Sequence, residues 1–193
     1  MEQSRDRILT DLLGIGVLTL ARILQYSCKN SRVRFRLGKI YSMMQQYAHD
    51  NYSVKVRNRY DIHPTVTWGV NTMIYGDGMI LIGEQIYIGR DSFIMSNPGE
   101  AKIVIGKHCA ISHSVHIRTG TYNTRMHFAD ALESQLDWAN IAIGDFVWFG
   151  AHTVICGGVT IGDNSIIGAN SVVTHDVPSN TIFGGIPARL IGR

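Results

Sequence analysis

The chain has 193 residues, of which 45% are hydrophobic, and its 18 Lys and Arg against 15 Asp and Glu give a formal net charge of +3. This composition can bury the core of one globular domain and excludes a disordered chain. The balance is only mildly basic, although basic residues gather between Arg22 and Lys39, so nothing in it favours a nucleic-acid-binding protein. Three widely spaced cysteines, Cys28, Cys109 and Cys156, predict reduced thiols instead of a disulfide framework or a CxxC site.

The first predicted region is helical and covers residues 1–55. Apolar residues recur at helical spacing over residues 7–26 and 34–48. The apolar run Leu12–Ala21 is too short to span a membrane, which needs about 20 such residues. Acidic residues before it, and no small-residue cleavage site after it, also argue against a signal peptide. We therefore expect an N-terminal helical segment.

The second predicted region, residues 56–193, repeats with a period of six. Neither a helix nor a two-sided strand produces this period, which is typical of parallel β-helices. Because alternate strand residues share a face, each hexad predicts one short strand with one large and one smaller inward residue. The large residues form the series Ile62, Trp68, Ile74 and Ile80; Ile82, Ile88 and Ile94; Ile105, Ile111 and Ile117; and Ile143, Phe149, Ile155, Ile161, Ile167 and Val173.

Gly, Asp and Asn follow many of the large residues and accept the left-handed backbone that a sharp corner needs. Phase slips between the blocks predict bulges or short insertions. The longest slip joins Ile117 to Ile143, 26 residues where 24 would keep phase, and no hexad occurs within it. We therefore predict a loop over residues 118–140, and such loops in regular solenoids are more often functional than structural.

Three ordered segments of the C-terminal third carry a family resemblance. They read IAIGDFVWFGAHTVI, GVTIGDNSIIGANSVVTHDVPSN and GGIPARLIGR. This stretch resembles the C-terminal coils of hexapeptide-repeat acyltransferases, especially bacterial sugar O-acetyltransferases of the maltose, galactoside and sialic-acid or O-antigen type. The resemblance covers residues 62–193.

The resemblance implies an all-β fold, a left-handed parallel β-helix with an N-terminal α-helical segment and an extruded loop. It also implies three hexads per coil and a homotrimer with active sites between neighbouring chains. The implied activity is transfer of acetyl from acetyl-CoA to a sugar hydroxyl in cell-surface polysaccharide synthesis, with no metal. The acceptor sugar, its hydroxyl, and acetyl against another acyl group stay open.

Acetyl transfer to an alcohol needs a base, and a histidine suits this role because its pKa lies near neutrality. His127 in NTRMHF resembles the histidine of the loop motif in sialic-acid-type O-acetyltransferases, whereas Tyr122 stands where the maltose-type enzymes would place their base. His116 in the regular coil is the alternative base, and His113 is a third nearby histidine. Trp148 in VWFG resembles a tryptophan that lines the acceptor and thioester site, and it is otherwise a core or interface aromatic.

The resemblance also suggests where acetyl-CoA binds. Gly150 and Ala151 would offer backbone N–H groups to the developing oxyanion. Ala151 and Ala169 would hold the pantetheine arm, and Thr174 and His175 would lie beside the nucleotide. Arg189 and Arg193 could supply positive charge to the coenzyme phosphates, or could be solvated basic residues.

Two other readings of the β-helix remain. A zinc enzyme of the γ-class carbonic anhydrase type uses two histidines five residues apart, the spacing of His108 and His113. Their register after Ile105 differs from that of the zinc enzymes, and no third histidine lies at a matching upstream site. A non-catalytic trimeric scaffold is the second alternative, because a fold does not guarantee an activity.

The sequence predicts a cytoplasmic protein. The apolar run Leu12–Ala21 and the basic residues that follow it suggest a peripheral contact with the inner membrane face, near a lipid-linked acceptor. A helical cap on the open end of the β-helix is the other interpretation of the N-terminal segment.

Overall fold

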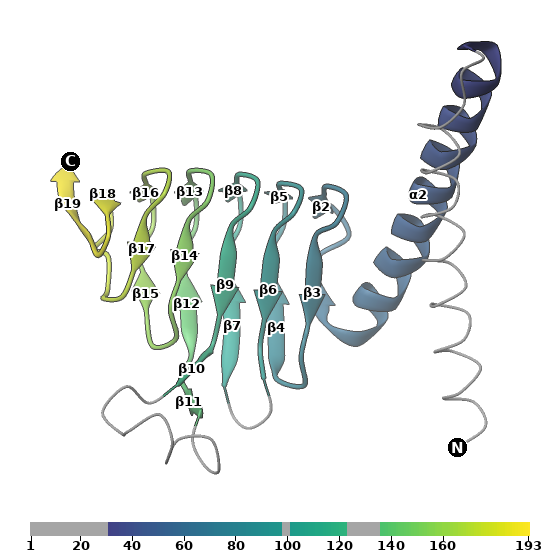
Figure 1. Ribbon diagram of the computed structural model, residues 1–193. Helices are drawn as coiled ribbons and strands as arrows, with labels where there is room; N and C mark the ends of the chain where they lie inside the picture. Colours follow the sequence, from purple (N-terminus) through teal and green to yellow (C-terminus); the bar gives the residue numbers. More distant parts are fainter. Residues whose placement is uncertain (1–30, 98–100, 123–135) are drawn as a thin grey trace. The chain divides into compact units, whose positions relative to one another are not determined.

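The computed structural model describes residues 31–97, 101–122 and 136–193 (Figure 1). The chain divides into two compact units, Met1–Lys55 and Val56–Arg193. The predicted helix over residues 7–26 lies outside the described residues. Within the part of the chain that the structure describes, no helix is both long and apolar enough to cross a membrane.

Helix α2 runs over Ser31–Arg59 and contains the predicted helix 34–48. It extends beyond the prediction because residues 39–59 contain neither Gly nor Pro. Gly38 is accommodated inside the helix, where its carbonyl accepts a hydrogen bond from Ser42 Oγ at 3.0 Å. Arg57 and Arg59 lie in the last turn, where cations interact favourably with the helix dipole.

The last turn of α2 belongs to the second unit and closes the first coil of the β-helix. Arg57 Nη1 donates to the carbonyl of His63 at 3.0 Å, and Arg57 Nη2 donates to the carbonyl of Val66. The Arg57 guanidinium also lies 4.6 Å from the centroid of the Trp68 ring. These contacts satisfy carbonyls at the open end of the solenoid, where no preceding coil is available to do so.

The second unit is a three-sided parallel β-helix (Figure 1). Sheet A contains β1 (Asp61–Ile62), β4 (Met79–Ile82), β7 (Lys102–Ile105), β12 (Ile141–Ile143) and β15 (Thr160–Ile161). Sheet B contains β2 (Thr67–Trp68), β5 (Tyr87–Ile88), β8 (Ala110–Ile111), β13 (Trp148–Phe149), β16 (Ile166–Ile167), β18 (Ile182–Gly185) and β19 (Ala188–Gly192). Sheet C contains β3 (Met73–Tyr75), β6 (Phe93–Met95), β9 (His116–Arg118), β14 (Val154–Ile155) and β17 (Val172–Val173).

The hexad residues form the core, as the period of six predicts. Each coil contributes one strand to each sheet, and the large residues align in register, for example Ile111 with Phe149 and Phe149 with Ile167. The whole predicted series is buried, from Ile62 to Val173. The smaller inward residues are buried too, and this second series includes Ile141, Val147, Thr153, Val159, Ser165 and Ser171.

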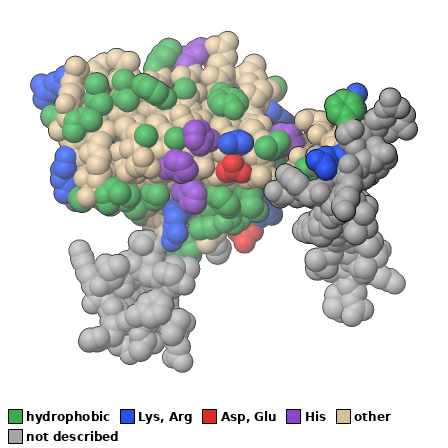
Figure 2. All heavy atoms as spheres, turned by 45° about the horizontal axis from the view of Figure 1, so that its top comes forward, with side chains coloured by type: hydrophobic (Ala, Val, Ile, Leu, Met, Phe, Trp, Pro, Cys, Tyr) green, Lys and Arg blue, Asp and Glu red, His purple; other side chains and the backbone are tan. Residues whose placement is uncertain are grey.

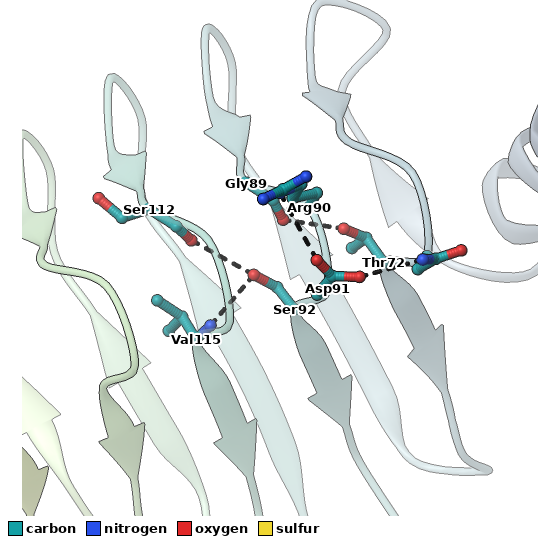
Figure 3. Close-up of polar contacts among 8 residues, drawn as sticks. Thr72, Gly89, Arg90, Asp91, Ser92, Ser112 and Val115 are labelled. Atoms are coloured by element: carbon teal, nitrogen blue, oxygen red, sulfur yellow. Dashed lines mark hydrogen bonds and ion pairs between the residues drawn. The ribbon is translucent and has the colours of Figure 1, made fainter. Parts of the chain in front are cut away.

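The B→C corner, which joins sheet B to sheet C, turns in the same way in all five coils. One non-glycine residue per coil has a positive φ there: Asn71, Asp91, Ser114, His152 and Asn170. The smaller inward residue that follows is polar in most coils, and its hydroxyl satisfies a coil carbonyl. Figure 3 shows this for Thr72, which donates to Gly89 O at 2.9 Å, and for Ser92, which donates to Ser112 O at 3.3 Å.

All the phase slips of the sequence occur at the C→A corner, which joins sheet C of one coil to sheet A of the next. Successive core isoleucines are 8 residues apart from Ile74 to Ile82, 11 from Ile94 to Ile105 and 26 from Ile117 to Ile143. The last slip contains a two-stranded antiparallel ribbon of β10 (Gly120–Tyr122) and β11 (Leu136–Trp138). The insertions therefore leave the solenoid along one edge.

Candidate active site

The B→C corner of the fourth and fifth coils has the smallest side chains of the predicted site. A Cβ atom on Gly150 would lie 2.4 Å from the backbone nitrogen of Ala169. Ala151 is half-buried and Ala169 is exposed, and the N–H of Asn170 donates to the Ala151 carbonyl at 2.9 Å. Gly150 therefore lets the next coil pack closely, and the two alanines present only methyl groups at the surface of this corner.

Gly150 and Ala151, the two predicted oxyanion donors, differ in their backbone hydrogen bonds. The Gly150 N–H donates to the carbonyl of Ile167 at 2.7 Å, as part of the contacts between coils. The Gly150 N–H has only this one proton, so it cannot also donate to an oxyanion. The N–H of Ala151 is therefore the remaining predicted donor.

Trp148 lies on the outer face of sheet B and is 52% exposed. In register, its neighbours on either side are Ala110 and Ile166. An indole with this exposure contributes little to the core of its own chain. It is available to a ligand or to another chain.

The predicted nucleotide end lies near the C-terminus. Thr174 and His175 are exposed, and Thr174 Oγ1 lies 2.8 Å from His175 Nδ1. Arg189 is in β19, the antiparallel partner of β18, and its Nη1 donates to the carbonyl of Ala188 at 2.8 Å. Arg193 is exposed as well.

The base of the predicted loop is built by close backbone contacts. A Cβ on Gly120 would lie 1.7 Å from the Trp138 ring, and one on Gly157 would lie 2.2 Å from the Thr119 carbonyl oxygen. Gly158 has a φ of +86°, which favours glycine. The glycines let the ribbon leave the coil here. His127 itself lies among residues 123–135, outside the described residues.

His116, the alternative base, is on the outer face of sheet C. It is half-buried, and its ring centroid lies 4.9 Å from that of Phe93, its neighbour in register on the preceding coil. It lies on the sheet between the B→C corner and the edge from which the loop departs.

The two described cysteines are poor nucleophiles. Burial raises the pKa of the Cys109 thiol to about 11, and burial also raises the pKa of the Cys156 thiol. Both thiols therefore stay protonated near neutral pH, which suits structural residues.

The histidines of the zinc alternative lie at different corners. His108 stacks on Phe146 at the A→B corner, which joins sheet A to sheet B, with ring centroids 4.9 Å apart. His113 lies at the B→C corner and faces His152, a residue with no predicted role. His113 and His152 are 39 positions apart in the sequence, so only the stacking of coils reveals that they are neighbours.

A shallow pocket at the first coil contains none of the predicted site residues. It is lined by residues 59–61 and 77–81, which include Arg59, Tyr60, Asp77 and Met79. The Tyr60 hydroxyl donates to the Gly76 carbonyl at 2.6 Å, and Arg59 forms an ion pair with Asp77. These contacts fasten the helix end to the β-helix.

Comparison with known proteins places these features in a family. Residues 140–175 match the family model of the bacterial transferase hexapeptide (six repeats). The galactoside O-acetyltransferase of Escherichia coli K12 is 32% identical over 154 residues, which cover 78% of this chain and 75% of that protein.

Solved structures agree. A galactoside acetyltransferase in complex with coenzyme A superposes with a TM-score of 0.56 at 26% identity, covering 90% of this chain and 78% of the other. The polySia-specific acetyltransferase NeuO superposes with a TM-score of 0.52 at 30% identity, covering 66% of this chain and 61% of the other. The three-sided fold is thus the left-handed parallel β-helix, and the chain belongs to the family of hexapeptide-repeat acetyltransferases.

Proposed function

We propose that the chain transfers an acetyl group from acetyl-CoA to a hydroxyl of a sugar in a cell-surface polysaccharide or its precursor. The observation that carries the proposal is the B→C corner of Ala151 and Ala169, whose small side chains reach the surface next to strand β13 with the exposed Trp148. The galactoside enzyme and NeuO support a sugar acceptor, and a related structure holds coenzyme A.

The acetyl donor fits the residues of this corner. Pantetheine is narrow and rich in amide groups, and small side chains at Ala151 and Ala169 let it reach backbone N–H and carbonyl groups. Thr174, His175 and Arg189 lie towards the C-terminus, where the coenzyme phosphates would gain hydrogen bonds and positive charge.

The chemistry is a direct displacement. His127 accepts the proton of the acceptor hydroxyl as the hydroxyl oxygen attacks the thioester carbonyl carbon. The carbon–sulfur bond then breaks, and the protonated imidazole returns the proton to the departing sulfur. The N–H of Ala151 stabilises the negative charge that develops on the carbonyl oxygen.

The parts of this site lie on different edges of one chain, which supports a homotrimer with shared sites. Ala151 and Ala169 are at the B→C corner, whereas the ribbon that carries residues 123–135 leaves at the C→A corner. The strands of sheet C lie between these two edges. A neighbouring chain could bring its loop to this corner without any bending of the solenoid.

Complementation between two inactive variants tests the whole proposal. His127→Ala removes the base, and Ala169→Phe fills the path of the pantetheine arm. Each variant alone should release little thiol from acetyl-CoA with sugar acceptors, whereas co-expressed chains should regain activity, because a mixed trimer contains one intact shared site. The scaffold alternative would be favoured if the unmodified protein formed stable trimers but neither bound acetyl-CoA nor transferred acetyl.

For the cellular location, we propose the cytoplasm, with a peripheral contact at the inner membrane face. Helix α2 supports such a contact because Phe35, Met43 and Tyr47 are exposed on it and Lys39 lies over the Phe35 ring at 4.9 Å. Exposed aromatic residues beside cations favour anionic lipid surfaces. Sedimentation with anionic vesicles tests this, and protein that stays in the supernatant would contradict it.

A further inference from the structure

Two histidines from successive coils face each other at the B→C corner. The ring centroids of His113 and His152 are 5.4 Å apart, and their planes are nearly perpendicular, at 84°. Both residues are exposed, and Figure 2 shows histidine side chains gathered on one face of the β-helix. Neither residue has a role in the proposed acetyl transfer.

The backbone holds these two residues at a fixed separation. The N–H of His152 donates to the carbonyl of His113 at 3.1 Å, one of the contacts that join coils at this corner. His152 also has a φ of 59°, the left-handed conformation that all five coils share here. The imidazoles therefore project from two turns whose backbones are joined by a hydrogen bond.

The spacing of the rings fits coordination of one metal ion. Metal–nitrogen bonds of about 2.1 Å at a tetrahedral angle place two imidazole centroids roughly 5 Å apart. The observed 5.4 Å is close to this value. Because both side chains are exposed and the imidazole torsion is broad, small rotations can turn one nitrogen of each ring to a common point.

We propose that His113 and His152 form a two-imidazole site for a late divalent transition-metal ion, namely Zn²⁺, Ni²⁺ or Cu²⁺. Imidazole nitrogen suits these ions and not Mg²⁺ or Ca²⁺. In the described part of the chain, no group of three His, Cys, Asp or Glu residues could hold a metal. Water or a bound molecule therefore fills the other coordination positions, and the ion exchanges readily.

The surrounding charges allow a cation at this corner. Arg90 occupies the position of His113 in the preceding coil. The N–H of Ser114, the residue after His113, donates to the Arg90 carbonyl at 2.9 Å. The Arg90 Nε lies 3.6 Å from Asp91 Oδ2, an ion pair that Figure 3 shows. Asp91 also accepts a hydrogen bond from Asn71 at 3.0 Å. The Asp91 carboxylate offsets the positive charge of Arg90.

The site lies next to the proposed path of acetyl-CoA, because His152 directly follows Ala151. If the chain has the proposed function, an ion bound to His113 and His152 lies beside the thioester end of the pantetheine arm. Occupancy should then inhibit acetyl transfer reversibly, with EDTA restoring the rate. This consequence rests on the proposed function, whereas binding of the ion does not.

The chain itself supplies substitutions that fit the fold. Ala151 and Ala169 occupy the position of His113 in later coils, and Asn71 and Asn170 occupy the position of His152. His113→Ala and His152→Asn should therefore preserve the corner, and unfolding curves verify this. His63→Ala is the matched control, because it removes an exposed histidine that lies on the first coil.

Isothermal titration of the full chain with NiCl₂ and ZnCl₂ decides the proposal. The unmodified protein and His63→Ala should bind with the same affinity, and His113→Ala and His152→Asn should each weaken binding roughly tenfold or more, since chelation is lost. Unchanged binding in either corner variant overturns the site. The titration needs no acetyl transfer, so an inactive protein whose ion binding depends on both histidines contradicts only the proposed function.

Discussion

A Cβ atom on Gly150 would lie 2.4 Å from the backbone nitrogen of Ala169, whereas a Cβ on Gly168 would meet nothing closer than 3.5 Å. Both glycines follow a large core residue of sheet B, and both stand at the B→C corner. Only the first is pressed against the next coil.

This difference predicts the outcome of two alanine substitutions. Gly150→Ala should lower the free energy of unfolding by about 1–3 kcal/mol, because the added methyl pushes backbone away. Gly168→Ala should change it much less. Urea unfolding of the two variants measures both values, and equal losses would contradict the packing described here.

Trp148→Ala should leave stability nearly unchanged, because the side chain is half exposed, but should lower kcat/KM for acetyl transfer. Tyr87→Ala is the matched control, since Tyr87 is 56% exposed on the same face of sheet B, two strands away through Ala110. Steady-state kinetics should separate the two variants. Comparable kinetics for them would place Trp148 outside the site.

His127→Ala should reduce kcat by roughly 10²–10⁴-fold with little effect on the thermal unfolding temperature. His116→Ala should retain most of the activity, because its ring packs beside Phe93 on the outer face of sheet C. Thiol release from acetyl-CoA measures both. Full activity in His127→Ala together with its loss in His116→Ala would reassign the base.

Arg57→Ala should destabilise the β-helix by about 1–3 kcal/mol, because the Val66 carbonyl loses its side-chain donor and the His63 carbonyl keeps only the N–H of Val66. It also removes the cation from the face of Trp68. Arg59→Ala should cost less, because its ion pair with Asp77 is exposed. Equilibrium unfolding monitored by Trp fluorescence compares them.

The Cys109 thiol gives a prediction for alkaline pH. Its pKa rises from the ordinary value of 9.0 to about 11 on folding, so the folded state binds the proton more tightly than the unfolded state. This contribution to stability is complete below pH 9 and is lost as the pH rises through about 11. The difference in unfolding free energy between the unmodified protein and Cys109→Ala should shrink over that range.

The sequence by itself determined the core and the sides of the solenoid. Strand residues alternate between faces, so a period of six identifies the inward positions from Ile62 to Val173, and these residues are buried. The same reasoning predicted the extruded loop, because hexads stop at Ile117 and resume at Ile141. The family resemblance, carried by residues such as Trp148 and Ala169, is also a property of the sequence alone.

Only the tertiary structure decided which residues meet between coils. His113 and His152 are neighbours because the insertion between Ile117 and Ile143 leaves the solenoid at one corner. The coils before and after it therefore remain hydrogen-bonded to each other. The separation of the two histidines along the chain depends on the length of that insertion, which the hexad period does not encode. For the same reason, the structure and not the sequence placed the small corner of Ala151 and the base of the loop on different edges of one chain.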